Sequence, residues 1–101
     1  MQVIKKTIKN MKKRLCLAEC DIDLALKYKD EYPELAKNQY TLSVELMNQF
    51  KLQHDYVVQI INNYKKQGYE VPEGMQAIYD YVHEEYTDWA AEIKAKQELF
   101  K

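Results

Sequence analysis

The sequence predicts an all-α protein: an antiparallel up-down-up bundle of three long helices that dimerisation would complete. Helix-breaking residues are few, because the 101 residues include two glycines and two prolines. They are also clustered, at residue 33 and from residue 68 to residue 74. Such clustering indicates a few long elements joined by two turns. Between the turns, apolar residues recur at alternating spacings of four and three, which places one stripe along each helix. The length suits a single domain spanning residues 1–101.

The first helix is expected over residues 4–29, which contain neither glycine nor proline. Its apolar stripe consists of Ile4, Ile8, Met11, Leu15, Ala18, Ile22 and Ala25. Because the spacing keeps these side chains on one side of the helix, we expect them to face the other two helices.

The second helix is expected over residues 33–67. Pro33 suits the first helical turn, where its missing N–H is not needed. The stripe consists of Ala36, Tyr40, Ser43, Met47, Phe50, His54, Val57, Ile61 and Tyr64. A second, weaker apolar edge on the same helix consists of Leu35, Leu42, Leu46, Tyr56 and Ile60. Three helices cannot enclose so much apolar surface, so part of this edge is expected to form an oligomer interface, most simply a homodimer.

The third helix is expected over residues 72–100, with Pro72 in its first turn. Gly68 is expected just beyond the end of the second helix, as the residue that terminates it. The stripe of the third helix consists of Met75, Tyr79, Val82, Tyr86, Trp89, Ile93 and Phe100, and Lys96 interrupts it.

The apolar runs are short, and none approaches the roughly 20 residues that a membrane-spanning helix needs. No span is therefore expected. Cys16 and Cys20 lie four residues apart on one predicted helix, a poor geometry for a disulfide. We expect two reduced thiols and hence a cytoplasmic protein.

A basic block opens the chain, and no acidic residue interrupts it before residue 15. It consists of Lys5, Lys6, Lys9, Lys12, Lys13 and Arg14. One hypothesis is an anion-binding surface for DNA or acidic lipid. The favoured interpretation pairs the block with the acidic part of the third helix, around Glu84, Glu85 and Asp88, because an up-down-up fold places the two side by side. Nucleic acid is not an expected partner, since no aromatic residues interleave the block.

One group of residues could hold a divalent metal ion. Counting residues along each helix from the loops places His54 at about the same height in the bundle as Asp80 and His83. Glu19 and Glu45 are further candidates for carboxylate ligands. The favoured alternative is a half-buried His54 that is hydrogen-bonded to Tyr86 or to the backbone, beside solvated glutamates. No resident cofactor is expected beyond such a metal ion.

No catalytic set is apparent in the sequence. There is no glycine-rich phosphate loop, and the only serine, Ser43, lies within a helix rather than at a strand-to-helix elbow. We therefore expect a non-enzymatic interaction or structural module that self-associates, with any other protein partner left open.

Two stretches carry a family resemblance: ALKYKDEYPELAKNQYTLSVELMNQFKLQHDYVVQII, and VPEGMQAIYDYVHEEYTDWAAEIKAKQELF further on. They resemble small ferritin-like helical proteins of Firmicutes and their prophages. The resemblance implies a phage or mobile-element origin and a metal site of the Glu-x-x-His type. Here Asp80 precedes His83 by three residues and Asn48 follows Glu45 by three. The implied metal site is therefore either degenerate or completed across a dimer.

Overall fold

The computed structural model describes residues 2–71 and 73–101, and the described chain is all-α, without a strand. The all-α prediction is therefore confirmed. The elements are α1 (Gln2–Tyr28), α2 (Pro33–Lys66), α3 (Glu73–Tyr81), the π-helical turn η1 (Val82–Tyr86) and α4 (Thr87–Phe100). Pro72, the expected start of the third helix, lies outside the described residues. None of the described helices is long and apolar enough to cross a membrane.

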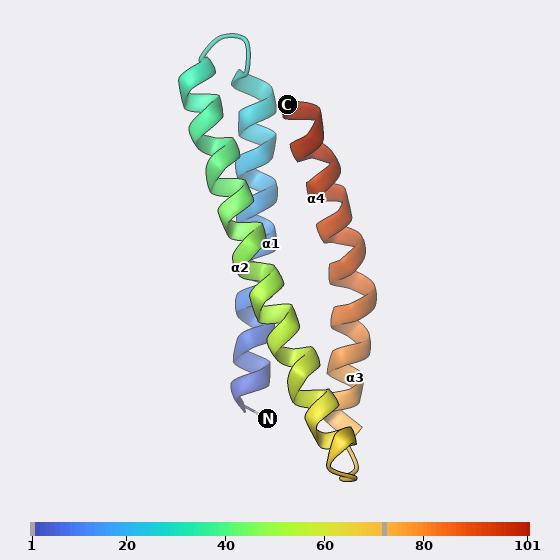
Figure 1. Cartoon of the computed structure of the whole chain (residues 1–101). Helices are drawn as coiled ribbons and strands as arrows, with labels where there is room; N and C mark the ends of the chain where they lie inside the picture. The colour runs from blue at the N-terminus through green and yellow to red at the C-terminus, as the bar shows by residue number, and fades with distance from the viewer. Residues whose placement is uncertain (1, 72) are drawn as a thin grey trace.

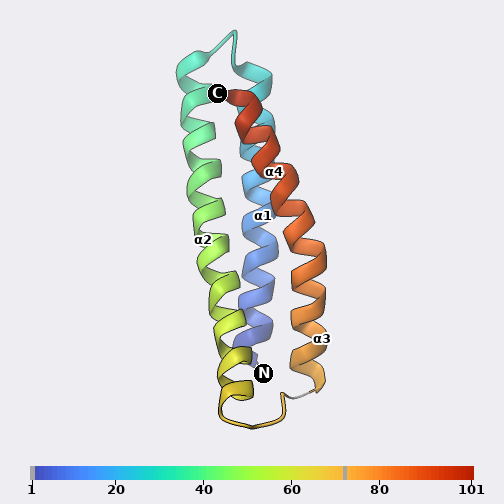
Figure 2. The same cartoon turned by 45° about the vertical axis from the view of Figure 1, so that its right-hand side comes forward.

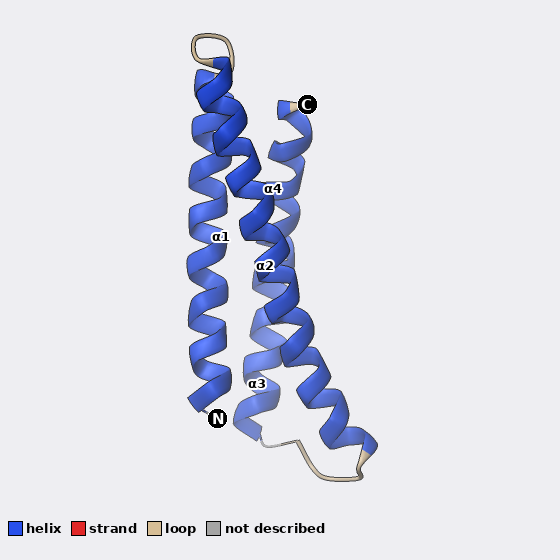
Figure 3. Ribbon diagram, turned by 60° about the vertical axis from the view of Figure 1, so that its left-hand side comes forward, coloured by secondary structure: helices blue, strands red, loops and turns tan. Residues whose placement is uncertain are grey.

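The chain reverses direction twice and is elongated, with extents of 56 × 21 × 17 Å. Helix α1 packs along α2, and the α3–α4 segment runs back beside them (Figure 1). Figure 2 places the C-terminus beside the α1–α2 turn, at the opposite end from the α2–α3 loop. Figure 3 shows that helix makes up most of the described chain, with loops drawn between α1 and α2 and after α2. The packing is closest between α1 and α2, and α4 contacts α1 more than it contacts α2.

The three apolar stripes meet in one core. Five α1 residues are fully buried, and Phe50 and Ile93 face them from α2 and α4. The buried apolar residues are Met11, Leu15, Ala18, Ile22, Ala25, Ala36, Phe50, Val57, Ile61, Met75, Val82, Tyr86 and Ile93. Ile8 and Trp89 are half-buried and pack against this core. The side chain of Ile4 lies outside the described residues.

Helix α2 ends in a Schellman motif. Gly68 has a φ of 78°, which L-residues with a Cβ rarely adopt. The N–H of Gly68 donates to the carbonyl of Lys65 (3.1 Å), and the N–H of Tyr69 donates to that of Tyr64 (3.0 Å). These two bonds satisfy carbonyls that the end of a helix would otherwise leave unpaired.

The third helical segment departs from a strict four-three count near its end. Gln97 is buried, whereas Lys96, which occupies the expected stripe position, lies half-exposed at the edge. A π-turn changes the helical phase of everything after it, and an ordinary helix drifts by about 20° per heptad. The turn η1 and this drift place residue 97 in the core and residue 96 at its edge, while Ile93 and Phe100 still contact the core.

Candidate functional site

His54 and His83 are the two predicted metal ligands that the fold brings together. Their rings stack, with centroids 6.5 Å apart, between α2 and η1. His83 also stacks on Tyr79 at 5.7 Å, and His54 lies 6.1 Å from the ring of Phe50. The two imidazoles therefore form part of a row of aromatic rings.

The hydrogen bonding of His54 differs from the expectation. Its Nε2 is buried without a hydrogen-bond partner in the described chain, and its Nδ1 lies 3.8 Å from the carboxylate of Asp55. The expected hydrogen bond to Tyr86 is absent from the bonds of the described residues. Ring packing, rather than a hydrogen bond, holds this side chain.

The three carboxylates predicted to complete the metal site lie elsewhere. Asp80 is exposed and accepts a hydrogen bond from the Nε2 of Gln76 at 3.0 Å. Glu19 accepts one from the indole N–H of Trp89 at 3.1 Å, and Glu45 is exposed on α2. Within residues 2–71 and 73–101, no three His, Cys, Asp or Glu side chains are grouped so that they could hold a metal ion.

The basic block lies along α1. Its five lysines are exposed and Arg14 is half-buried; the lysines are Lys5, Lys6, Lys9, Lys12 and Lys13. Lys12 lines a cleft together with Glu85 and Asp88, as the up-down-up alignment predicted, but no ion pair joins the block to an acidic residue among the described side chains.

The ion pairs between α1 and α4 have the opposite arrangement, with the acids on α1. The Nζ of Lys96 lies 2.9 Å from Asp23 and 3.7 Å from Glu19. The hydrogen bond to Asp23 raises the pKa of Lys96 above its ordinary value. These pairs fix the height of α4 against α1, although each contributes little because it is partly exposed.

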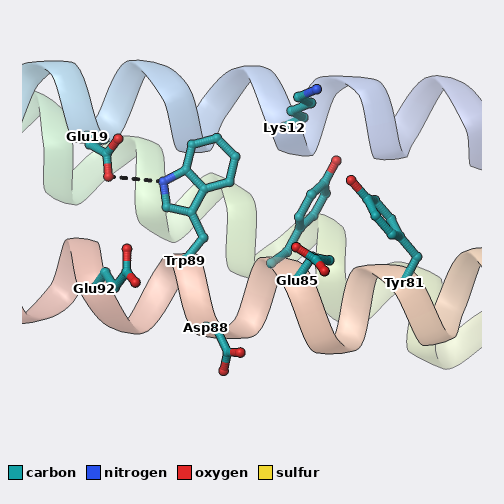
Figure 4. Close-up of a pocket in the computed structure, with 8 residues that line it drawn as sticks. Lys12, Glu19, Tyr81, Glu85, Asp88, Trp89 and Glu92 are labelled. Carbon is teal, nitrogen blue, oxygen red and sulfur yellow. Dashed lines mark hydrogen bonds between the residues drawn. The ribbon is translucent and has the colours of Figure 1, made fainter.

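The cleft between α1 and the α3–α4 segment holds ≈ 400 Å³ (Figure 4). Trp89 projects from α4 toward α1, and Asp88 points away from it (Figure 4). The lining residues are Lys12, Glu19, Tyr81, Glu85, Tyr86, Asp88, Trp89 and Glu92. These side chains provide neither a nucleophile paired with a base nor a set of converging donors, so they do not form a catalytic arrangement.

A buried polar chain links the three helices. The Nε2 of Gln97 donates to the hydroxyl of Ser43 (3.0 Å), which donates to the backbone carbonyl of Ala18 (2.8 Å). Ser43 is fully buried and Gln97 nearly so. Each donor thereby has an acceptor inside an apolar core, so the chain specifies one register of α4, α2 and α1.

An apolar groove lies between α2 and α4, with a volume of ≈ 450 Å³. Val44, Met47 and Phe50 line it from α2, and Ala90 and Ala91 line it from α4. This groove marks which side of α2 faces α4, and therefore also which side faces away.

The opposite side of the α1–α2 hairpin carries a patch that we call the outer leucine face: Leu17, Leu24, Leu35, Leu42 and Leu46. Glu19 and Asp23 of α1 face α4, and Leu17 lies about 200° around the helix from Glu19, at roughly 100° per residue. Leu42 is likewise about 200° from the groove residue Val44. The four leucines other than Leu46 are 37–48% exposed.

The α2 leucines of this face belong to the second apolar edge predicted from the sequence, which also included Tyr56 and Ile60, whereas Leu17 and Leu24 were not part of that prediction. Leu17 and Leu24 lie one heptad apart, each one residue before a core position, and this spacing was the available signal. Their role depends on which flank of α1 the third helix covers, which the spacing alone does not say.

Two oppositely charged side chains lie on the same side of α1 as the outer leucine face, and both are half-buried. The Nε of Arg14 is buried and has no hydrogen-bond partner among the described residues. Burial raises the pKa of Asp21, and no hydrogen bond or ion pair involving this carboxylate occurs in residues 2–71 and 73–101. Partly desolvated charges of this kind are costly when unpaired.

No family model, curated protein or solved structure matches this chain. The resemblance to ferritin-like proteins therefore remains a prediction based on the two quoted stretches.

Proposed function

We propose that this protein is a non-enzymatic helical interaction module, an up-down-up bundle that forms a homodimer through the outer leucine face. The observation that carries the proposal is the exposure of leucines on the side of the α1–α2 hairpin that α4 leaves uncovered. Clusters of exposed large apolar side chains on soluble proteins commonly mark surfaces that bind another protein.

The hairpin architecture favours a second copy as the occupant. A pair of antiparallel helices that is apolar on both sides forms half of a four-helix arrangement, and an identical pair can supply the other half. Charge complementarity within the face points the same way, because it carries one half-buried cation and one half-buried anion, Arg14 and Asp21.

Mass measured by light scattering across a dilution series tests the proposal. We expect a dimer that dissociates on dilution. Leu42→Glu introduces a charge into the centre of the face and is expected to yield a monomer. Leu52→Glu is the matched control, because Leu52 is 70% exposed on another side of α2. A wild-type protein that is monomeric at every concentration would contradict the proposal.

The cell compartment and origin belong to the same proposal. Cys16 and Cys20 are free and exposed, a state that suits the reducing cytoplasm. A phage or mobile-element origin rests on the family resemblance alone. Co-purification from cells under reducing conditions would identify any partner besides a second copy.

Divalent-metal binding at His54 and His83 is a second candidate function. The stacked imidazoles and the unpartnered Nε2 of His54 favour it. Elemental analysis of protein purified without chelators tests it, with His54→Ala as the comparison. Stoichiometric zinc, iron or manganese that the variant loses would support metal binding, and metal-free wild-type protein would end this candidate.

A further inference from the structure

We propose that the two copies pair about a twofold axis that passes α1 at the height midway between Leu17 and Ala18, so that Arg14 of each copy forms an ion pair with Asp21 of the other. This inference rests on the proposed self-association and specifies its geometry. The axis is perpendicular to the helices and lies in the plane of the interface. Helix α1 therefore packs antiparallel on the second copy's α1, and α2 on its α2.

The positions of the two charges require this centre. In a twofold interface every contact occurs twice. If Arg14 of the first copy contacts Asp21 of the second, then Asp21 of the first copy contacts Arg14 of the second. Arg14 and Asp21 lie equally far from the point between Leu17 and Ala18, about 5 Å along the helix at roughly 1.5 Å per residue. A twofold axis there brings both unlike pairs together at once, and Leu17 lies beside the axis.

The residue pattern of α2 is symmetric about Val44, which lies at the same height as the proposed axis. Leu42 and Leu46 lie equally far from Val44, and so do Gln39 and Gln49. Because the hydroxyl of Ser43 donates to the carbonyl of Ala18, Val44 lies within about one residue of the height of the α1 centre. The axis that pairs Arg14 with Asp21 therefore also places Leu42 against Leu46 and one glutamine amide against another.

The other face-to-face arrangement leaves the charges unpaired. A twofold axis parallel to the helices would place α1 of one copy over α2 of the other. The half-buried glutamines Gln39 and Gln53, which lie nearest the α2 leucines, carry no charge. Glu45 lies about 200° around α2 from the buried Ser43, at roughly 100° per residue, and so on the flank that faces away from α1. Arg14 would then have no acid to meet, and its buried Nε would remain without a partner.

The ion pairs are expected to determine orientation more than affinity. A buried pair roughly offsets its own desolvation, whereas a mispaired or unpaired charge in the same place is strongly unfavourable. The leucines would supply the attraction, and the two Arg14–Asp21 pairs would exclude the other orientation.

Charge reversal tests the pairing in the full-length protein. Arg14→Glu places two acids where an unlike pair should form, and Asp21→Arg places two bases there. Each single variant is expected to raise the dimer dissociation constant at least about tenfold. The double variant R14E/D21R restores unlike pairs, and its dissociation constant is expected to return to within about threefold of wild type. Circular dichroism checks that each variant is folded.

Mixing the two single variants is the second measurement. At a concentration between the dissociation constants of wild type and of the single variants, Arg14→Glu protein and Asp21→Arg protein are each expected to be mostly monomeric, and together they are expected to form a heterodimer. The matched control is K9E/D30R, which makes equivalent charge changes at exposed positions outside the face and should dimerise like wild type.

The outcomes separate the two proposals. A wild-type dimer that L42E disrupts, but whose single charge variants bind normally or whose double variant stays as weak as the singles, would overturn the Arg14–Asp21 pairing and leave self-association in place. A monomeric wild-type protein would overturn both.

Discussion

The side-chain amide of Gln97 donates a hydrogen bond to the hydroxyl of Ser43, 3.0 Å away in the core. The two residues are 54 positions apart in the chain. Since Ser43 in turn donates to Ala18, the two bonds connect all three helices. These hydrogen bonds lie in a largely apolar core. They form only when the three helices are aligned at one particular height relative to one another.

Ser43→Ala is expected to destabilise the fold by about 1–3 kcal/mol, because it leaves the buried amide of Gln97 without its acceptor. Urea unfolding followed by circular dichroism measures the free energy of unfolding. Thr41→Ala is the control: Thr41 is exposed and its hydroxyl donates only to the carbonyl of Lys37 on the same helix, so a change under about 0.5 kcal/mol is expected. Equal losses in the two variants would contradict this account.

Gly68→Ala is expected to cost about 1 kcal/mol, because φ at this position is 78°. The cost is conformational, since no atom outside Gly68 and its two chain neighbours lies within 4 Å of the place that a Cβ would occupy. Gly68→Asn should cost less, because asparagine tolerates the left-handed region. In thermal unfolding, we expect wild type to be the most stable of the three proteins, the asparagine variant to be intermediate and the alanine variant to be the least stable. An alanine variant as stable as wild type would refute this order.

Glu19→Ala is expected to lower stability by about 0.5–1.5 kcal/mol, because Trp89 loses its 3.1 Å hydrogen bond in a half-buried cleft; the partly exposed ion pair with Lys96, at 3.7 Å, adds little. Trp89 is the only tryptophan, so its fluorescence reports both the local change and the unfolding transition. Glu92→Ala is the control, because Glu92 lines the same cleft without a hydrogen bond among the described residues. Identical emission spectra and midpoints for the two variants would count against the Trp89–Glu19 contact.

Lys96 is expected to make stability depend on alkaline pH. Its hydrogen bond with Asp23 raises the pKa above the ordinary 10.5, so the folded state holds the proton more tightly than the unfolded state. The contribution of the Lys96 ammonium group to the free energy of unfolding is complete at pH values below the pKa of this lysine in the unfolded state. It is lost as the pH rises through the higher pKa of the folded state. We expect about 0.2–1 kcal/mol, because the pair is partly exposed.

The measurement for Lys96 compares urea midpoints of wild type and Lys96→Met from neutral pH to pH above about 11. The comparison removes the pH effects that wild type and the variant share. Wild type should lose its advantage over the variant as the lysine deprotonates. A difference that is constant with pH would show that the Lys96 ammonium group contributes nothing.

The helical pattern of the chain follows directly from the sequence. Met11, Leu15 and Phe50 were predicted to face inward from spacing alone, and they are buried. Gly68 was predicted to terminate the second helix, and it occupies the left-handed position of the Schellman motif. Both features are local, because periodicity and the tolerance of positive φ belong to a few neighbouring residues.

The candidate site was only partly predictable. His54 and His83 were expected to be neighbours, and their rings stack, but Glu19 bonds to Trp89 and Asp80 to Gln76. Turn counting estimates height along a bundle, whereas ligation also requires that side chains point to the same spot, which depends on rotation about each helix axis.

Helix, turn positions and the apolar stripe of each helix follow from the residue pattern, because they depend on spacing within a helix and on a few helix-breaking residues. Which flank of each stripe is covered depends instead on how the helices pack against one another. Once α4 lies against Glu19 and Asp23, the opposite flank with Leu17 is left open, and Gln97 rather than residue 96 reaches Ser43. Rotation of one helix against another is set by packing between segments far apart in the chain, and no local pattern encodes it.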